Sequence, residues 1–307
     1  MRTSLLIDVA PQITEALQRG GPIVALESAV ISHGLPHPTS LETAAALEAE
    51  VRNAGAIPAT VAVIAGRIKV GATARELERL RSAPVIKIAA RDLPVAVATS
   101  ANGGATVSAT VAIADLTGIA VAATGGIGGV HLGAERTWDV SADLRALAEH
   151  PIAVVCAGAK AICDIGKTLE YLDTAGVPVV VYGSDRFPHF YARDSGFPAP
   201  RRIETPQQAA AIHAAARALG RRTALLIANP IPAAEALRET DVEDAVRRAM
   251  ERASAAGVRA GDLTPFLLTA LADLTGGRSL RANLALLRAN AALAGAVAVA
   301  VSRPETA

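Results

Sequence analysis

The chain of 307 residues has few aromatic side chains, few cysteines and little net charge. Aromatic residues make up 3% of it, which argues against the stacking platforms that bind single-stranded nucleic acids. Its 30 basic and 29 acidic side chains leave a net charge of +1, and neither sign forms a long run. The cysteines, Cys156 and Cys163, cannot build a disulfide framework and fit a reducing compartment. We therefore expect no nucleic-acid partner.

Targeting and membrane-spanning patterns are lacking as well. The first apolar run is broken by Asp8 and Pro11, so it does not have the form of a signal peptide. The most lipid-like stretch covers residues 291–301, about half the length that a bilayer requires. We expect this stretch to form a buried or interface helix, and we expect a cytoplasmic protein without membrane contact.

Small and aliphatic residues dominate instead, and hydrophobic residues reach 51%, which excludes a disordered chain. Short apolar runs, typical of strands covered on both faces, alternate with helical patterns. The runs cover residues 22–28, 59–66, 119–126, 152–158, 177–183 and 223–230. This alternation predicts an α/β fold with three α/β/α layers, a central, largely parallel or mixed sheet flanked by helices, and a helical C-terminal third. We expect a single domain over residues 1–307.

Three charged side chains stand at the ends of apolar runs, where ligands bind in such folds: Glu27, Lys87 and Lys160. A buried charge is costly unless it is paired or functional. Lys160 follows an apolar segment that favours an unprotonated amine, a nucleophile suited to Schiff-base chemistry; alternatively its stem packs while the amine reaches water. Glu27 is either a protonated general acid or a carboxylate bonded to the amides of the next loop.

A second acidic segment contains Asp139, Ser141 and Asp143. Ser141 followed by an early acid has the form of a helix N-cap, and this structural interpretation is favoured for the segment as a whole. The functional alternative is that Asp139 binds a hard divalent cation through its carboxylate and water. The residues alone leave both alternatives open.

Glycines and histidines give weaker signals. Residues 125–129, GGIGG, lack the spacing of a dinucleotide-binding loop, so they form either a tight turn or an anion-binding loop. His33 and His37 have a separation seen in metal sites, but prolines flank His37 on both sides. No helix can then align both rings, which argues against a zinc site.

Long motifs in register are more specific than any single residue. In order, the chain contains ALESAVISHGLPHP, PATVAVIAGRIKVG, IKIAARDLP, NGGATVSAT, ATGGIGGVHLGAERTWDVSADL, VVCAGAKAICD, ANPIP, TPFLL and LTGGRSLRAN. Over residues 22–300 this set resembles the pseudouridine-5′-phosphate glycosidases of the indigoidine synthase A-like family. No fused sugar-kinase domain of the kind that some relatives carry is expected.

The resemblance implies an activity, a cofactor and an assembly. The family reaction is the reversible cleavage of the C–C glycosidic bond of pseudouridine 5′-phosphate to uracil and ribose 5-phosphate, in pseudouridine degradation. It is also classed as pseudouridylate synthase, a carbon–oxygen hydro-lyase, and a lysine–ribose iminium is the intermediate that we expect. One Mn²⁺ per subunit, replaceable by other divalent cations, and a homotrimer are further expectations.

The motifs also carry over site residues. The nucleophile falls on Lys160, the proton donor on Glu27 and the metal ligand on Asp139. The substrate-binding positions implied by the resemblance are Lys87, Val107, His131, Ser141, Ala142, Asp143 and Asn283.

Two other functions remain open at this point. A C-glycosylating enzyme would join ribose 5-phosphate to another acceptor with the same Lys160 and Glu27, because the reaction is reversible. A non-catalytic relative that only binds sugar phosphates is the second alternative. The presence of Glu27, Lys160 and Asp139 together speaks against it.

Overall fold

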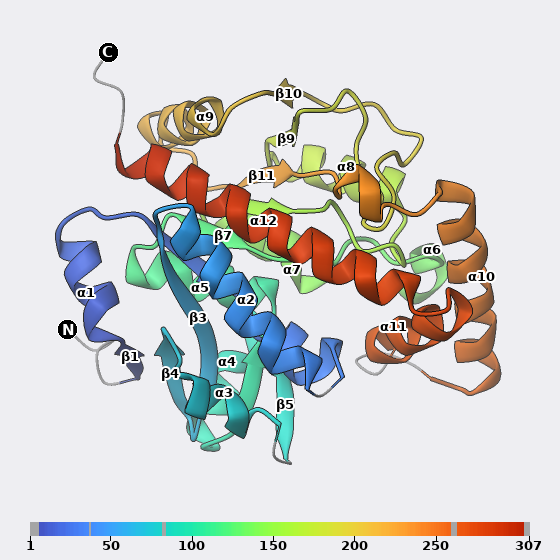
Figure 1. The fold of residues 1–307 in the computed structure, drawn as a ribbon, viewed down its shortest axis with the longest axis horizontal. Coiled ribbons are helices and arrows are strands. Elements are labelled where there is room, and N and C mark those ends of the chain that lie inside the picture. The colour runs from blue at the N-terminus through green and yellow to red at the C-terminus, as the bar shows by residue number, and fades with distance from the viewer. Residues whose placement is uncertain (1–5, 37, 82–83, 259–262, 304–307) are drawn as a thin grey trace.

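A computed structural model describes residues 6–36, 38–81, 84–258 and 263–303, and its centre is an eleven-stranded sheet (Figure 1). The strands are β1 (Ile7–Val9), β2 (Ile23–Leu26), β3 (Ile57–Ile64), β4 (Arg67–Val70), β5 (Val85–Ile88), β6 (Asn102–Ala105), β7 (Val121–Ala123), β8 (Ala153–Cys156), β9 (Val179–Tyr182), β10 (Arg202–Ile203) and β11 (Leu225–Ala228). The order is β1-β4-β3-β2-β7-β8-β11-β9-β10, and β6 pairs with β3 and β5. From β3 to β10 all neighbours are parallel, whereas β4 and β6 run antiparallel to β3. The predicted mixed sheet is confirmed.

Helices cover both faces of this sheet. They are α1 (Pro11–Gln18), α2 (Thr39–Asn53), α3 (Ala74–Arg79), α4 (Leu93–Ala98), α5 (Val107–Thr117), α6 (Ala134–Thr137), α7 (Ala142–Glu149), α8 (Ile165–Thr174), α9 (Pro206–Ala218), α10 (Glu239–Ala255), α11 (Leu263–Leu274) and α12 (Arg278–Ser302). A π-helix, η2 (Val30–Gly34), and two 3₁₀ turns, η3 (Ala90–Asp92) and η4 (Ala233–Glu235), complete the list. In Figure 1, α2 and α12 lie across one face, and α5 and α7 lie behind the other. The three layers and the helical C-terminal third are as predicted.

The sheet divides where β2 ends, and this division opens the space for a site. The first half of β3 pairs with β2 and the second half pairs with β6. Ser28 lies where the two halves separate and is fully buried. Its hydroxyl donates to the carbonyl of Val61 at 2.5 Å and accepts from the N–H of Ala105 at 3.0 Å. Its own N–H donates to the carbonyl of Ala105 at 3.1 Å. Glu27 and the start of α5 are thereby held close together.

Helix α12 is the longest in the described chain and packs against α2, α9 and strands β2, β7 and β8. It has 25 residues, so it is longer than the apolar stretch read from the sequence, and the expectation of a segment too short for a bilayer is wrong. By length and composition it could cross a membrane, yet 50% of its most apolar window is buried within this fold. Its contacts are those of a core helix, as predicted.

The crossing of α12 over α2 depends on Gly295. A Cβ atom built at Gly295 would lie 2.5 Å from the Cβ of Ala54 and 3.2 Å from the carbonyl oxygen of Val51. Neither neighbour is the end of a flexible side chain, so the two helices would have to separate.

We predict that Gly295→Ala destabilises the fold. Alanine is the better helix former by about 1 kcal/mol, but the overpacking outweighs this gain, and the free energy of unfolding should fall by about 1 kcal/mol or more. Urea unfolding measures this change. In Gly295→Ala/Ala54→Gly the offending Cβ is gone, so stability should partly return; a single mutant more stable than the wild type would contradict the close crossing.

Candidate active site

Two adjoining chambers lie at the carboxyl ends of the parallel strands. The first, here the apolar chamber, has a volume of about 530 Å³ with open solvent included. It is lined mostly by apolar side chains, among them Val30, Phe190, Leu268 and Leu287, and also by Asn283. The second, here the polar chamber, has a volume of about 1480 Å³ with open solvent included. It is lined by Arg91, Thr106, Ser108, His131, Asp139, Ser141, Ala142 and Asp143, among others. A ligand with an apolar and an anionic end would fit this division.

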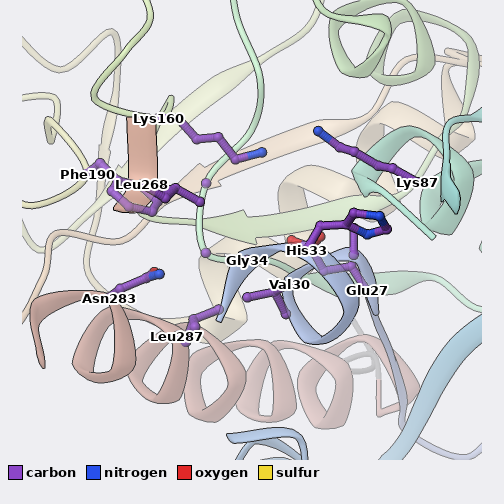
Figure 2. Close-up of a pocket in the computed structure, with 13 residues that line it drawn as sticks. Glu27, Val30, His33, Gly34, Lys87, Lys160, Phe190, Leu268, Asn283 and Leu287 are labelled. Atoms are coloured by element: carbon purple, nitrogen blue, oxygen red, sulfur yellow. The ribbon is translucent and has the colours of Figure 1, made fainter. Parts of the chain in front are cut away.

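Glu27, Lys87 and Lys160 line both chambers and therefore stand at their junction. They come from separate elements: the end of β2, strand β5 and the loop after β8. Figure 2 shows the amines of Lys87 and Lys160 pointing toward each other, with Glu27 beside His33 below them. The three charged residues singled out by their positions in the sequence thus meet in one cavity.

Burial controls the chemistry of Glu27. Loss of solvation raises the pKa of its carboxyl, while the charge of Lys160 and a hydrogen bond donated by the Thr124 hydroxyl act in the opposite direction. The carboxyl therefore keeps its proton at a pH where an exposed glutamate has lost it. A proton held at this position is what a general acid requires.

The backbone of Lys160 is held by the glycine loop, residues 125–129. Its N–H donates to the carbonyl of Ile127 at 2.9 Å, and its carbonyl accepts from the N–H of Cys163 at 2.9 Å. Its neighbours in the sequence carry no charge, but the fold brings the carboxyl of Glu27 into the same cavity. Lys160 therefore shares the cavity with an acidic group, placed there by the residue that follows β2.

Lys87 and His131 are two further basic groups of the polar chamber, besides His33 and the exposed Arg91. Burial lowers the pKa of Lys87, and the charge of Lys160 lowers it further, against the carboxylates of Asp143 and Glu27. Burial also lowers the pKa of His131, against the charge of Asp139. The imidazole is neutral at pH 7, so the polar chamber presents lysine as its buried cation.

The segment around Ser141 is a helix start, as its sequence suggested. The Ser141 hydroxyl caps α7 by accepting the N–H of Asp143 at 3.2 Å. Asp143 is 5% exposed, and its two oxygens accept the N–H groups of Ser108 at 2.9 Å and Gly128 at 2.8 Å. Ser141, Ala142 and Asp143 all line the polar chamber. Asp143 therefore lines the chamber and also joins two segments of its wall, those of Ser108 and Gly128, by hydrogen bonds.

Val107 and Asn283 lie in different surroundings. Val107 is the first residue of α5 and is 3% exposed, with its side chain in the core, while Thr106 and Ser108 on either side line the polar chamber. Any contact with a ligand is thus left to its backbone, at a helix N-terminus that favours anions. Asn283 projects from α12 into the apolar chamber (Figure 2).

The residues around Asp139 suit only a particular kind of metal site. Among the described residues no group of three or more His, Cys, Asp or Glu side chains is placed to hold a metal ion. Asp139 is 42% exposed and its carboxylate lies 3.9 Å from Nδ1 of His131. One carboxylate beside an open polar chamber fits a hydrated divalent cation, which keeps most of its waters. His37, considered with His33 for zinc, lies outside the described residues.

His33 is a site residue that the sequence did not single out for this role. It lies in the π-helix η2 and lines both chambers. Its Nδ1 is 2.7 Å from the Ser32 hydroxyl. Its ring is hydrogen-bonded to the backbone of Val85, which lies in β5 two residues before Lys87. Burial, followed by the charge of Lys87, lowers its pKa. His33 thus ties the chain after Glu27 to strand β5.

Asn290 is a second polar residue near the site that the sequence did not single out. It is 1% exposed, and its amide donates to the carbonyls of Thr124 at 2.8 Å and Gly125 at 3.2 Å. It accepts from the amide of Asn229 at 3.0 Å. These bonds join α12 to the ends of β7 and β11 and hold the floor of the apolar chamber.

Comparisons with known proteins identify the family of this chain. The family model described as indigoidine synthase A like protein matches residues 12–300. A protein from Methylobacterium nodulans named pseudouridine-5′-phosphate glycosidase is 52% identical over 96% of this chain and 88% of its own length. One of the same name from Herpetosiphon aurantiacus is 51% identical over 95% of this chain and 97% of its own.

Two solved structures are similar over 97% of this chain and 97% of theirs. One is the prealnumycin C-glycosynthase AlnA in complex with ribulose 5-phosphate, 38% identical with a TM-score of 0.89. The other is an indigoidine synthase A-like protein from Thermotoga maritima, 33% identical with a TM-score of 0.89. The resemblance drawn from the motifs is confirmed, and the chain belongs to the indigoidine synthase A-like family.

Proposed function

We propose that this chain is a pseudouridine-5′-phosphate glycosidase that cleaves pseudouridine 5′-phosphate reversibly to uracil and ribose 5-phosphate. The observation that carries the proposal is the meeting of Lys160 and Glu27 at the junction of an apolar and a polar chamber. Relatives about half identical over nearly the whole chain bear this name, which supports the same substrate class here.

A C–C glycosidic bond poses a chemical problem that these two residues can solve. The base leaves from carbon, so protonating a leaving oxygen or nitrogen on it cannot break the bond. In the first step the Lys160 amine attacks the anomeric carbon and loses its proton. Glu27 protonates the ring oxygen, and the bond between this oxygen and the anomeric carbon breaks. The opened ribose is then attached to both Lys160 and uracil.

In the second step the lone pair of the lysine nitrogen forms a C=N bond to the anomeric carbon. Glu27, ionised after it has protonated the ring oxygen, takes up the proton that the lysine nitrogen loses. The C–C bond breaks as Glu27 passes this proton to the departing uracil carbon, which leaves an iminium on Lys160. Water hydrolyses the iminium, returns the amine and releases ribose 5-phosphate. Over both steps one water is consumed, and every proton taken up is returned.

The two chambers suggest how the substrate lies. Its phosphate belongs in the polar chamber, where Lys87 and the N-terminus of α5 provide positive charge. The uracil belongs in the apolar chamber, where Asn283 is the polar side chain contributed by α12. The anomeric carbon then falls at the junction, within reach of Lys160 and Glu27. Such positioning of the reacting groups itself lowers the barrier.

A divalent cation, Mn²⁺ above all, is part of the proposal. Asp139 would hold it, with His131 close by. The cation would supply positive charge toward the phosphate and orient the sugar. Asp139 and His131 otherwise act by shaping the wall of the polar chamber. A homotrimeric assembly and a cytoplasmic location complete the proposal, and both are drawn from the family resemblance.

A second candidate is the reverse reaction with another acceptor. One specific observation favours it, since the C-glycosynthase AlnA is 38% identical over 97% of this chain. The same Lys160 and Glu27 would serve, because each step is reversible. Synthesis from ribose 5-phosphate with uracil, compared with other planar acceptors, separates the two candidates.

We predict that Lys160→Ala abolishes uracil release from pseudouridine 5′-phosphate in the presence of Mn²⁺. The loss should be at least about 10³-fold in kcat, since a nucleophile is removed. Borohydride should trap a ribose 5-phosphate adduct on Lys160 of the wild type during turnover, located by mass spectrometry. Lys167→Ala is the matched control, because Lys167 pairs with Glu135 and Asp164 on the surface. A folded, metal-loaded wild type that releases no uracil would refute the proposal.

Glu27→Gln should lower activity and raise stability. The cost in kcat is about 10²–10⁴-fold, as expected for a general acid, and the wild-type rate should fall as pH rises through the raised pKa of Glu27. The folded chain binds this proton more tightly than the unfolded chain, so wild-type stability declines with pH above the ordinary value of 4.5.

Glutamine cannot ionise, so the Tm of Glu27→Gln should exceed that of the wild type near pH 8 and approach it near pH 4. Thermal unfolding followed by circular dichroism measures both. A Tm difference that shrinks as pH rises would mean that Glu27 is ionised in the folded chain.

Removal of divalent cations is expected to reduce uracil release, and Mn²⁺ should restore it. Asp139→Asn should bind Mn²⁺ at least about 10-fold more weakly, because the cation loses the one carboxylate ligand that the chain would supply. Electron paramagnetic resonance of free Mn²⁺ gives this affinity without any assay of activity. Asp173→Asn, at an exposed position on α8, serves as the control. Equal affinity of Asp139→Asn and the control would remove Asp139 from the metal site.

A further inference from the structure

The loop between β9 and β10, residues 183–201, places one aromatic side chain in the wall of the apolar chamber. Phe190 is 4% exposed and lines this chamber, but it is absent from the lining of the polar one. In Figure 2 it lies beside Leu268 on the side of the cavity away from Lys87. The loop connects two strands far from the nucleophile in sequence, so its approach to the site is a feature of the fold.

The backbone of Phe190 is held in an unusual conformation. Its φ angle is 54°, in the left-handed region that bulky residues rarely adopt. The N–H of Phe190 donates to the carbonyl of Ala157 at 3.1 Å, on the chain that leads to Lys160. On either side, His189 and Ala192 exchange backbone hydrogen bonds of 2.9 and 3.1 Å. Such strain persists where the surroundings fix it, and it is most frequent at functional sites.

The ring of Phe190 is fixed as firmly as its backbone. A Cβ atom built at Gly126 would lie 2.6 Å from two atoms of the ring, so the ring packs directly on the backbone of the glycine loop. Tyr191 meets the ring edge to face, with centroids 4.6 Å apart and an interplanar angle of 78°. The ring cannot turn or withdraw without moving the loop that positions Lys160.

We propose that Phe190 determines which base the enzyme accepts, by forming a rigid aromatic wall against which the planar base packs at the moment of bond cleavage or formation. The inference rests on the proposed function, which places the base in the apolar chamber. A flat unsaturated ring gains both apolar burial and aromatic contact at such a wall. Asn283 can then read the polar edge of the base from α12.

A rigid wall also limits the size of the base. Uracil carries hydrogen at both carbons of its C=C bond, so it presents a narrow edge on that side. With the wall in place, a bulky group at the 6-position has to compete with Phe190 or its neighbours for space. Replacing Phe190 by a smaller side chain removes both the aromatic contact and the size limit, whereas tryptophan narrows the chamber further.

The test is synthesis from ribose 5-phosphate with uracil, 6-methyluracil and 6-phenyluracil, in the wild type and in Phe190→Leu, Phe190→Ala and Phe190→Trp. For the two smaller variants we expect KM for uracil to rise at least tenfold while KM for ribose 5-phosphate stays within twofold. The ratio of kcat/KM for 6-phenyluracil to that for uracil should rise at least tenfold in Phe190→Ala. Phe190→Trp should lower the ratio for 6-methyluracil.

Phe197→Ala is the matched control, because Phe197 belongs to the same loop, is 40% exposed and packs over Gly166 away from the chambers. It should leave both KM values and the acceptor ratios unchanged. Circular dichroism and thermal unfolding show which variants fold, and Phe190→Leu is the variant judged if Phe190→Ala does not. If both KM values rise together, or the acceptor ratio stays constant in a folded variant, the inference is overturned.

Failure of the inference can be told apart from failure of the proposed function. Borohydride trapping of ribose 5-phosphate on Lys160 without any acceptor reports the donor half of the site, and it should be equal in the wild type and in Phe190→Leu. A wild type that forms this adduct but joins no uracil to it contradicts the proposed function. In that case the inference about Phe190 is judged with the planar acceptor that the wild type does use. It is overturned unless KM for that acceptor rises in Phe190→Leu while KM for ribose 5-phosphate stays within twofold.

Discussion

The carboxylate of Asp143 holds together the segments that enclose the polar chamber. It is 5% exposed, and a buried carboxylate is tolerated when it is hydrogen-bonded. One oxygen accepts from Ser108 in the first turn of α5 and the other from Gly128 in the glycine loop, while Asp143 itself lies in the first turn of α7. Its charge also acts on Lys87 and His131 across the cavity. The position of the α5 N-terminus and the glycine loop relative to α7 therefore depends on this one side chain.

Much of the fold could be predicted because each central strand is a short apolar run covered on both faces. Each of the six runs read from the sequence overlaps a strand in the structure. Strands β1, β4, β5, β6 and β10 lie outside these runs. The least expected of them is β6, since Asn102–Ala105 reads Asn-Gly-Gly-Ala and has no β-branched residue. It is a strand because β3 and β5 pair with it. Tertiary pairing overrides a weak local preference in such a case, and no local pattern could reveal it.

The site was predictable to the extent that its residues carry charge in apolar surroundings. Glu27, Lys87 and Lys160 stand out on that ground alone, and the family motifs add His131, Asp139 and residues 141–143 of the polar chamber. In the apolar chamber the motifs add only Asn283. Phe190 comes from an irregular loop, and Asn290 bonds to a carbonyl 166 positions away along the chain. An aromatic ring or an amide in an apolar sequence resembles any core residue until the fold shows what it faces.

In the proposed mechanism, cleavage and formation of a C-glycoside require the same groups on the sugar side, because the forward and reverse reactions pass through the same transition states. Lys160, Glu27 and the polar chamber would then serve in the same way whichever base is bound. A difference between a glycosidase and a glycosynthase of this family must therefore arise either from concentrations of reactants or from the chamber that receives the base. The neighbour AlnA, similar over nearly the whole chain, is a C-glycosynthase by name, so the shared architecture does not by itself fix the acceptor. In the proposed placement of the substrate, that choice falls to the apolar chamber, whose walls include residues of α11, α12, the π-helix and the loop of Phe190. The acceptor can then change by substitutions that leave the lysine chemistry untouched.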